Sequence, residues 1–292
     1  MRTVPISVRV AVVVAVGLTL AGCAQRGAGA SGSTVAVITS FYPLQFVTER
    51  VAGPAATVRN LTKPGAEPHD LELGPRDVAD LGDADLVVYL SGFQPAVDTA
   101  VDQQAESTSF DVAPAARLDA KDPHFWLDPT RLADVGDAVA DRLAEADPAG
   151  AADFRRNATT LRADLEALDA EMSEGLADCA SADLVTSHTA FGYLAERYGL
   201  TQRGITGLMP EDEPSSSDLA AIADFVAANE VRTIYAETLV SPAVAETVAR
   251  ETGARTALLD PLEGLDESSQ AGDYLAVMRA NLATLREGQG CR

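Results

Sequence analysis

The chain has 292 residues, of which 47% are hydrophobic, and this is enough to build two cores of medium size. Its formal net charge is −22 at pH 7, with 44 acidic residues against 22 basic ones. A surface of this charge repels polyanions, so we exclude nucleic acid as a partner, and the charge by itself names no ligand.

The N-terminus has the pattern of an export signal. Arg2 and Arg9 flank a short basic region at the N-terminus. The apolar run 11–20 that follows is too short to span a bilayer. The run leads into Leu20-Ala21-Gly22-Cys23, which resembles the lipobox of bacterial lipoproteins. We therefore predict a signal peptide at 1–22, a lipidated Cys23 that begins a flexible tether over 23–33, and a mature protein anchored by lipid at the extracytoplasmic face of the cell membrane.

After the tether, short β-branched segments alternate with longer amphipathic ones. The β-branched segments predict strands at 35–39, 57–61, 85–91 and 107–112. Apolar residues three and four positions apart predict helices at 43–52, 75–83, 94–104 and 131–146. Strands that alternate with helices are typical of a parallel sheet, so we expect an N-terminal α/β lobe over 34–146.

A long helix and a second lobe are expected next. Pro148 suits the start of a helix, and the stretch 151–176 has no glycine or proline before Gly175. At 1.5 Å per residue this helix would extend about 40 Å, enough to run from one lobe to another. We assign 147–178 to a linker helix and 179–292 to a C-terminal α/β lobe, each lobe holding a mostly parallel four-stranded sheet. The second lobe's strands are predicted at 183–187, 202–205, 232–236 and 256–259, and its helices at 190–198, 216–229, 242–252 and 271–286.

The three cysteines have two expected roles, lipidation and a disulfide bond. If Cys23 carries lipid, Cys179 and Cys291 remain, and an even pair in an exported protein predicts a disulfide. This bond would attach the C-terminal tail to the start of the second lobe.

The three histidines, His69, His124 and His188, lie at the ends of predicted strands or in the loops that follow them. Ligands of open parallel sheets bind beyond the carboxyl ends of the strands, so the three imidazoles could face one cleft. Neutral imidazole is a common zinc ligand, and a closed tetrahedral site needs a fourth donor. We choose Asp260 because it ends the last predicted strand, although it could instead cap the turn before Pro261, and we keep Glu263 as the alternative.

At these residues the chain resembles a known family, the metal-binding receptors of ATP-driven zinc and manganese importers. The resemblance rests on four segments: Gly65-Ala66-Glu67-Pro68-His69-Asp70, Asp122-Pro123-His124-Phe125-Trp126-Leu127-Asp128-Pro129, His188-Thr189-Ala190-Phe191-Gly192-Tyr193-Leu194 and Leu259-Asp260-Pro261-Leu262. It implies two α/β lobes joined by one long helix, with His69 and His124 from the first lobe and His188 and Asp260 from the second. Some relatives use the glutamate of the Pro-Leu-Glu segment as the fourth ligand, which leaves the choice between Asp260 and Glu263 open.

The resemblance also implies a function. Manganese-type relatives usually carry Glu at the third position, so His188 indicates the zinc-type branch, and three nitrogen donors with one carboxylate suit tetrahedral zinc. The chain is then expected to be a monomer that carries Zn²⁺ as transported ligand to the permease of an ABC importer. Asp70, Thr189 and Glu237 are candidates for orienting the imidazoles.

Other functions fit the same residues less well. A receptor for manganese or another divalent metal and a surface adhesin are the alternatives that keep the family. A zinc hydrolase would also use three histidines, but the chain has no His-Glu-x-x-His or Gly-x-Ser-x-Gly motif, and four protein ligands leave no position for an activated water. We therefore expect no enzymatic activity.

Overall fold

The computed structural model describes residues 34–119, 121–265 and 272–292. The predicted signal peptide, lipidated Cys23 and tether lie outside the described residues. Residues Thr34–Arg292 form one compact unit. Among the residues described, no helix combines the length and the apolar character needed to cross a bilayer.

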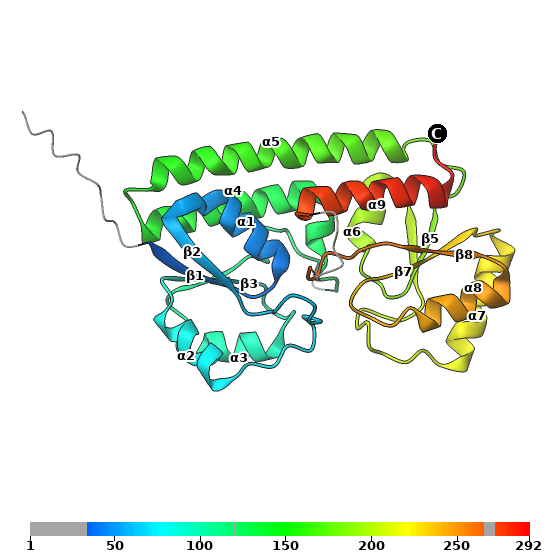
Figure 1. The fold of residues 1–292 in the computed structure, drawn as a ribbon, viewed down its shortest axis with the longest axis horizontal. Helices are drawn as coiled ribbons and strands as arrows, with labels where there is room; N and C mark the ends of the chain where they lie inside the picture. Colours follow the sequence, from blue (N-terminus) through cyan, green and yellow to red (C-terminus); the bar gives the residue numbers. More distant parts are fainter. Residues whose placement is uncertain (1–33, 120, 266–271) are drawn as a thin grey trace, which may run out of the picture. The chain divides into compact units, whose positions relative to one another are not determined.

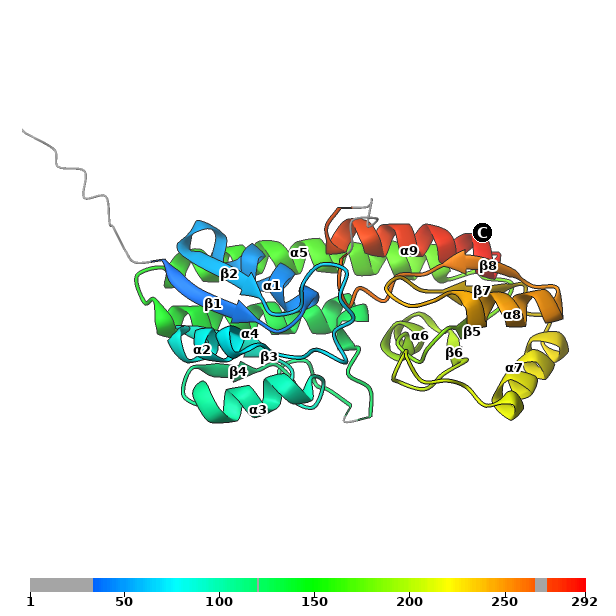
Figure 2. The same cartoon turned by 60° about the horizontal axis from the view of Figure 1, so that its bottom comes forward.

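The first sheet has four parallel strands in the order β2-β1-β3-β4. Helices α2 and α3 cover one face through a core that includes Leu81 and Val97, while α1 and α4 cover the other (Figures 1 and 2). Proline at the first turn of α2, α3 and α4 supplies a preset φ where no backbone donor is needed. The elements are β1 (Val35–Thr39), α1 (Tyr42–Ala52), the 3₁₀ turn η1 (Gly53–Ala55), β2 (Ala56–Asn60), α2 (Pro75–Asp83), β3 (Leu86–Tyr89), α3 (Pro95–Gln104), β4 (Ser109–Asp111), η2 (Phe125–Leu127) and α4 (Pro129–Ala146).

The second sheet repeats this plan with parallel strands in the order β6-β5-β7-β8. Helices α7 and α8 cover one face through a core that includes Val226 and Val248, and residues of α6 and α9 belong to the large core on the other face. The elements are β5 (Asp183–Thr186), α6 (Gly192–Tyr198), β6 (Thr201–Gly204), α7 (Ser216–Ala228), β7 (Thr233–Ala236), α8 (Ala243–Thr252), β8 (Arg255–Leu258) and α9 (Tyr274–Gln289). Two parallel four-stranded sheets with helices on their faces confirm the predicted α/β fold class.

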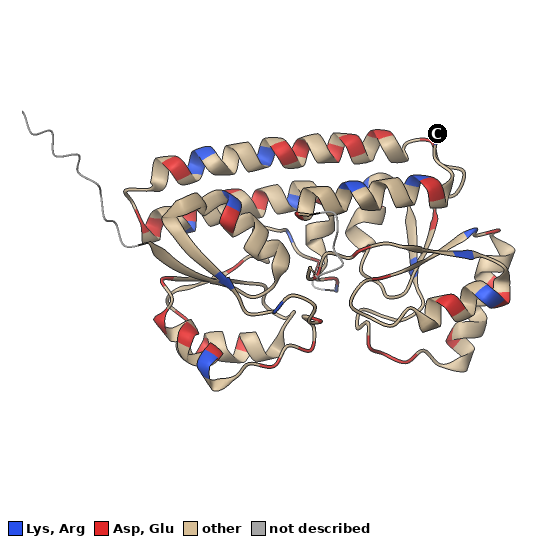
Figure 3. Cartoon of the chain, in the orientation of Figure 1, with Lys and Arg blue, Asp and Glu red and all other residues tan. Residues whose placement is uncertain are grey.

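Helix α5 (Ala151–Leu176) packs against elements that flank both sheets, as Figure 1 shows. Its 26 residues extend for about 39 Å at 1.5 Å per residue. One stripe of the helix is buried: Phe154, Ala158, Leu161, Leu165, Leu168, Met172 and Leu176. Its basic residues lie in its first half and its second half is acidic (Figure 3), and several of these residues pair with arginines or acids of α1, α4, α6 and α9. Each such exposed pair contributes about 0–1 kcal/mol, so the apolar stripe holds the helix in place.

The disulfide between Cys179 and Cys291 joins the segment after α5 to the segment after α9 across 112 residues of sequence, which confirms the predicted pair. At the same end of the molecule, Gly175 gives α9 room to approach, since a Cβ there would lie 2.8 Å from Leu282 Cδ1. The disulfide therefore closes a contact between two helices that already pack closely.

The predicted elements agree with the observed ones to within a few residues. The predicted helix 151–176 coincides with α5, whereas the strand predicted at 85–91 is shorter, because only Leu86–Tyr89 pair with neighbouring strands. The division into lobes at 34–146 and 179–292 with a linker at 147–178 stays a proposal, because residues 34–292 form a single compact unit.

Candidate metal centre

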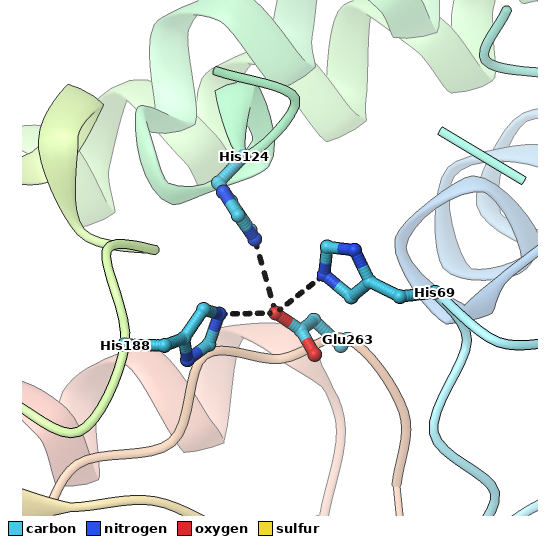
Figure 4. A group of neighbouring side chains, drawn as sticks. All are labelled: His69, His124, His188 and Glu263. Carbon is cyan, nitrogen blue, oxygen red and sulfur yellow. Dashed lines mark hydrogen bonds and ion pairs between the residues drawn. The ribbon is translucent and has the colours of Figure 1, made fainter. Parts of the chain in front are cut away.

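His69, His124, His188 and Glu263 point their polar atoms at one position (Figure 4). One nitrogen from each imidazole and one carboxylate oxygen all lie within 4.8 Å of one another. Glu263 Oε1 lies 3.1 Å from His124 Nε2, 3.1 Å from His188 Nε2 and 3.5 Å from His69 Nε2. All four residues are buried, with at most 5% of each exposed.

Each of the four residues follows the carboxyl end of a parallel strand. His69 comes after β2, His124 after β4, His188 after β5 and Glu263 after β8. The loops that leave such strand ends converge at one edge of a sheet, which is where open α/β folds bind ligands. Two sheets therefore bring together side chains that are far apart in the sequence.

The distances from Glu263 Oε1 to the three imidazole nitrogens are close to those of a tetrahedral metal site. Four bonds of about 2.0 to 2.1 Å in a tetrahedron separate neighbouring ligand atoms by about 3.3 Å. The three distances from Glu263 Oε1, 3.1, 3.1 and 3.5 Å, bracket this value. Three neutral imidazoles and one carboxylate are a donor set suited to Zn²⁺.

Carboxylates on the far side of two imidazoles orient them. His124 Nδ1 lies 2.7 Å from Asp122 Oδ1, and His188 Nδ1 contacts Glu237 Oε2. A carboxylate that accepts a hydrogen bond from Nδ1 keeps the imidazole proton on that nitrogen and leaves Nε2 as the metal-ligating atom. In both residues Nε2 is the nitrogen that faces Glu263.

His69 is held differently. Its backbone N–H donates to Glu67 Oε1 at 3.1 Å, and its ring packs edge-on against Phe93, with centroids 4.6 Å apart. The preceding carbonyl, that of Pro68, accepts from Gln94 Nε2 at 3.1 Å. The 3.5 Å between His69 Nε2 and Glu263 is long for a hydrogen bond, so this buried nitrogen is poorly satisfied without a further partner such as a metal ion.

The buried charges influence one another strongly. Burial raises the pKa of Glu263, but the hydrogen bonds from His124 and His188, together with the nearby imidazole of His69, outweigh burial and hold that pKa well below its usual value. Burial lowers the pKa of His188, but the carboxylates of Glu237 and Glu263 outweigh it and raise the pKa to about 10. The pKa of His124 is raised in the same way, by Asp122 and Glu263 against the effect of burial. Without a metal, the carboxylate is therefore charged and favours protons on His124 and His188.

The structure brings together the three predicted histidines and the alternative acid, Glu263, and it does not bring Asp260 into the group. Asp260 Oδ1 accepts from the backbone N–H of Leu262 at 2.8 Å, and its own N–H and carbonyl bond to the Asn281 side chain at 2.9 and 2.7 Å. Leu262 between them has a φ of 59°, in the left-handed region, so the chain turns sharply before Glu263. Asp260 shapes this turn, as the competing interpretation of its position held.

Of the three residues expected to orient imidazoles, Glu237 contacts one. Asp70 is exposed, and Thr189 Oγ1 donates to the carbonyl of Thr206 at 3.1 Å. Asp122 was not among the residues predicted to orient an imidazole. Its place two residues before His124 was a usable signal, because aspartates often accept hydrogen bonds from groups two residues further along the chain.

A cavity of about 550 Å³ lies beside His69. Ser91, Phe93, Leu118, Lys121 and Met209 are among its lining residues, whereas His124, His188 and Glu263 do not line it. Solvent in this cavity thus meets the group of four through His69.

The chain matches known proteins over most of its described length. The profile of the family described as "ZnuA: Zinc-uptake complex component A periplasmic" matches residues 37–288. "Zinc-binding protein AdcA" of Streptococcus pyogenes serotype M3 is 35% identical over 285 residues, which cover 86% of this chain and 55% of that protein. The chain thus spans about half the length of the AdcA relatives it matches.

Two further similarities cover the other protein almost completely. "High-affinity zinc uptake system protein ZnuA" of Bacillus subtilis is 31% identical over an alignment of 304 positions, which covers 94% of this chain and 95% of that protein. Among solved structures, the Zn(II)-bound ZnuA-like domain of Streptococcus pneumoniae AdcA superposes with a TM-score of 0.75 at 34% identity, covering 88% of this chain and 99% of that one.

Proposed function

This chain belongs to the family described as zinc-uptake complex component A, periplasmic, and on that premise we propose that it is an extracytoplasmic receptor that binds Zn²⁺ and delivers it to an ABC importer. The observation that carries the proposal is the convergence of three imidazole nitrogens and Glu263 Oε1 on one buried position. Zinc is here the cargo, held by His69, His124, His188 and Glu263 as its four ligands.

The proposed site leaves no position for catalysis. A catalytic zinc keeps one coordination position open for water or substrate, while four protein ligands close the tetrahedron. A closed site supports binding of the ion and argues against hydrolase activity.

The proposed location follows from the N-terminal sequence. The lipobox-like Leu20-Ala21-Gly22-Cys23 would place acyl chains on Cys23, and the small residues of the tether would let the folded part move at the outer face of the membrane. The partner in this proposal is the importer's permease. With the proposed lobes at 34–146 and 179–292, each lobe supplies two of the four ligands, which supports a zinc site between the proposed lobes.

Metal analysis of the purified protein tests the proposal. A soluble form that begins after Cys23 is expected to hold one zinc ion per chain, and His124→Ala and His188→Ala are expected to lose it. Asp70→Asn serves as the matched control, because Asp70 is exposed and directly follows a proposed ligand. Full zinc occupancy in both histidine variants would refute the proposed site. Relative manganese binding should increase in His188→Glu, because manganese favours oxygen donors.

A further inference from the structure

The segment Asp122–Asp128, which carries His124 and is called here the His124 segment, makes hydrogen bonds to elements far along the chain as well as to its own sequence neighbours. It follows β4 of the first sheet and leads into α4, and its long-range partners are α6, α9 and the loop after β8. Those elements all come after α5 and belong with the second sheet. The segment also packs against the first sheet's elements, since the ring centroid of Trp126 lies 4.9 Å from that of Phe41 and 5.6 Å from that of Phe93. One histidine that the sequence assigns to the first lobe is therefore bonded to the second as well.

Tyr193 of α6 makes the first attachment. Its hydroxyl donates to the carbonyl of Asp122 at 3.2 Å and accepts from the backbone N–H of Asp119 at 2.6 Å. The neighbouring Gly192 allows the close approach, since a Cβ there would lie 2.5 Å from Asp122 Oδ2. Asp122 in turn binds both the backbone N–H and the Nδ1 of His124, at 3.0 and 2.7 Å. One phenol is thus connected to a proposed zinc ligand through a single residue.

Trp126 and Tyr274 make the second attachment, on the other side of His124. The indole Nε1 of Trp126 donates to the carbonyl of Pro261 at 2.8 Å, two residues before Glu263. The carbonyl of Trp126 accepts from the hydroxyl of Tyr274, in α9, at 2.6 Å. Trp126 and Tyr274 are both fully buried, and the Trp126 ring centroid is 5.2 Å from that of His124. His124 and Glu263 are thereby held in register by bonds that involve neither side chain.

We propose that Tyr193 and Tyr274 are positioning residues that lock the His124 segment onto the elements of the second sheet, so that His124, His188 and Glu263 form one preassembled three-ligand unit. This inference rests on the proposed function, because the unit matters only if the site binds zinc. Holding ligands in place before the ion arrives strengthens binding, because less conformational freedom is lost on binding. Loosening either attachment then lets His124 leave the ion more often.

The test compares three variants that each remove one buried phenol hydroxyl. Tyr193→Phe and Tyr274→Phe cut the two attachments. Tyr235→Phe is the matched control, because Tyr235 is fully buried, like Tyr274, and its hydroxyl donates to Gln289 Oε1 at 2.9 Å, remote from the His124 segment. Zinc dissociation is measured by transfer to an excess of a chromophoric chelator, and the emission maximum is measured on zinc-free protein. Trp126 is the chain's only tryptophan, so this emission reports on the His124 segment alone.

Tyr193→Phe and Tyr274→Phe are each expected to raise the zinc dissociation rate by about fivefold, the factor that one net hydrogen bond represents. They are also expected to shift the Trp126 emission to longer wavelength, while Tyr235→Phe leaves both quantities at the values of the unaltered protein. The proposal is overturned if both variants match the control in dissociation rate, or if neither shifts the emission. The emission comparison needs no metal, so it decides the attachment even if the unaltered chain held no zinc, a result that would refute the proposed function instead.

Discussion

Replacing Glu263 by glutamine isolates the contribution of one carboxylate to the proposed zinc site. Glutamine keeps the size of the side chain and a neutral oxygen but removes the charge. Oε1 of Glu263 is the atom that faces all three imidazoles, at 3.1, 3.1 and 3.5 Å, so the substitution acts at the centre of the group.

The expected loss follows from the number of ligands. Zinc held by four protein ligands in small peptides gains about 10–16 kcal/mol, so one ligand in four accounts for about 3 kcal/mol. A loss of that size weakens binding by about 100-fold, because every 1.4 kcal/mol changes Kd tenfold. The buried oxygen of glutamine cannot neutralise the ion, which is why we expect the full loss despite the conserved shape.

Competition titration with a zinc chelator measures this change, and Asp260→Asn is the matched control. Asparagine retains an oxygen that can accept from Leu262 N–H, so the turn before Glu263 is expected to survive and the affinity to change by less than about tenfold. If Asp260→Asn weakened zinc binding as much as Glu263→Gln, the assignment of Glu263 as fourth ligand would be wrong.

Three other predictions concern protons, orientation and the disulfide. Zinc binds the neutral form of imidazole, and the pKa values of His124 and His188 are raised (about 10 for His188), so protons compete with zinc at neutral pH. Zinc binding should therefore release protons, and the zinc affinity should rise with pH. Calorimetry that gives the same binding enthalpy in buffers of different ionisation enthalpy would contradict this. Glu237→Gln should weaken zinc binding about 10- to 100-fold, because His188 loses the carboxylate that orients it, and an unchanged titration would show that the contact is dispensable. Reduction of the disulfide should lower the free energy of unfolding by up to about 4.7 kcal/mol, since it closes a loop of 112 residues, and a denaturation midpoint that does not move with reductant would rule out a stabilising role.

The helices and strands were predictable because local patterns specify them. The stretch 151–176 has no helix breaker before Gly175 and a repeating apolar stripe, and the helix forms over those residues. The three histidines could be placed together because parallel strands end at one edge of a sheet, whichever residues separate them in sequence. The strand predicted at 85–91 was too long because Leu90 and Ser91 continue the strand-like sequence but do not pair with the neighbouring strands. Residue type alone does not show where backbone pairing ends.

The choice of the fourth acid lay beyond local patterns. Asp260 and Glu263 are both carboxylates at the end of the same strand, so composition and spacing could not separate them. The difference arises from the left-handed φ of Leu262 and from the bonds of Asn281 in α9 to Asp260, and both depend on residues packed from elsewhere.

By itself, the sequence determined the alternation of strands and helices, the long helix, the pairing of Cys179 with Cys291 and the three imidazoles. The tertiary structure alone decided that Glu263 rather than Asp260 joins them, and that Tyr193, Trp126 and Tyr274 fasten the His124 segment to the second sheet's elements. The physical reason is that periodicity and strand ends are properties of neighbouring residues. The direction of a side chain after a turn, and the partner of a buried donor, depend instead on segments that meet only when the chain has folded.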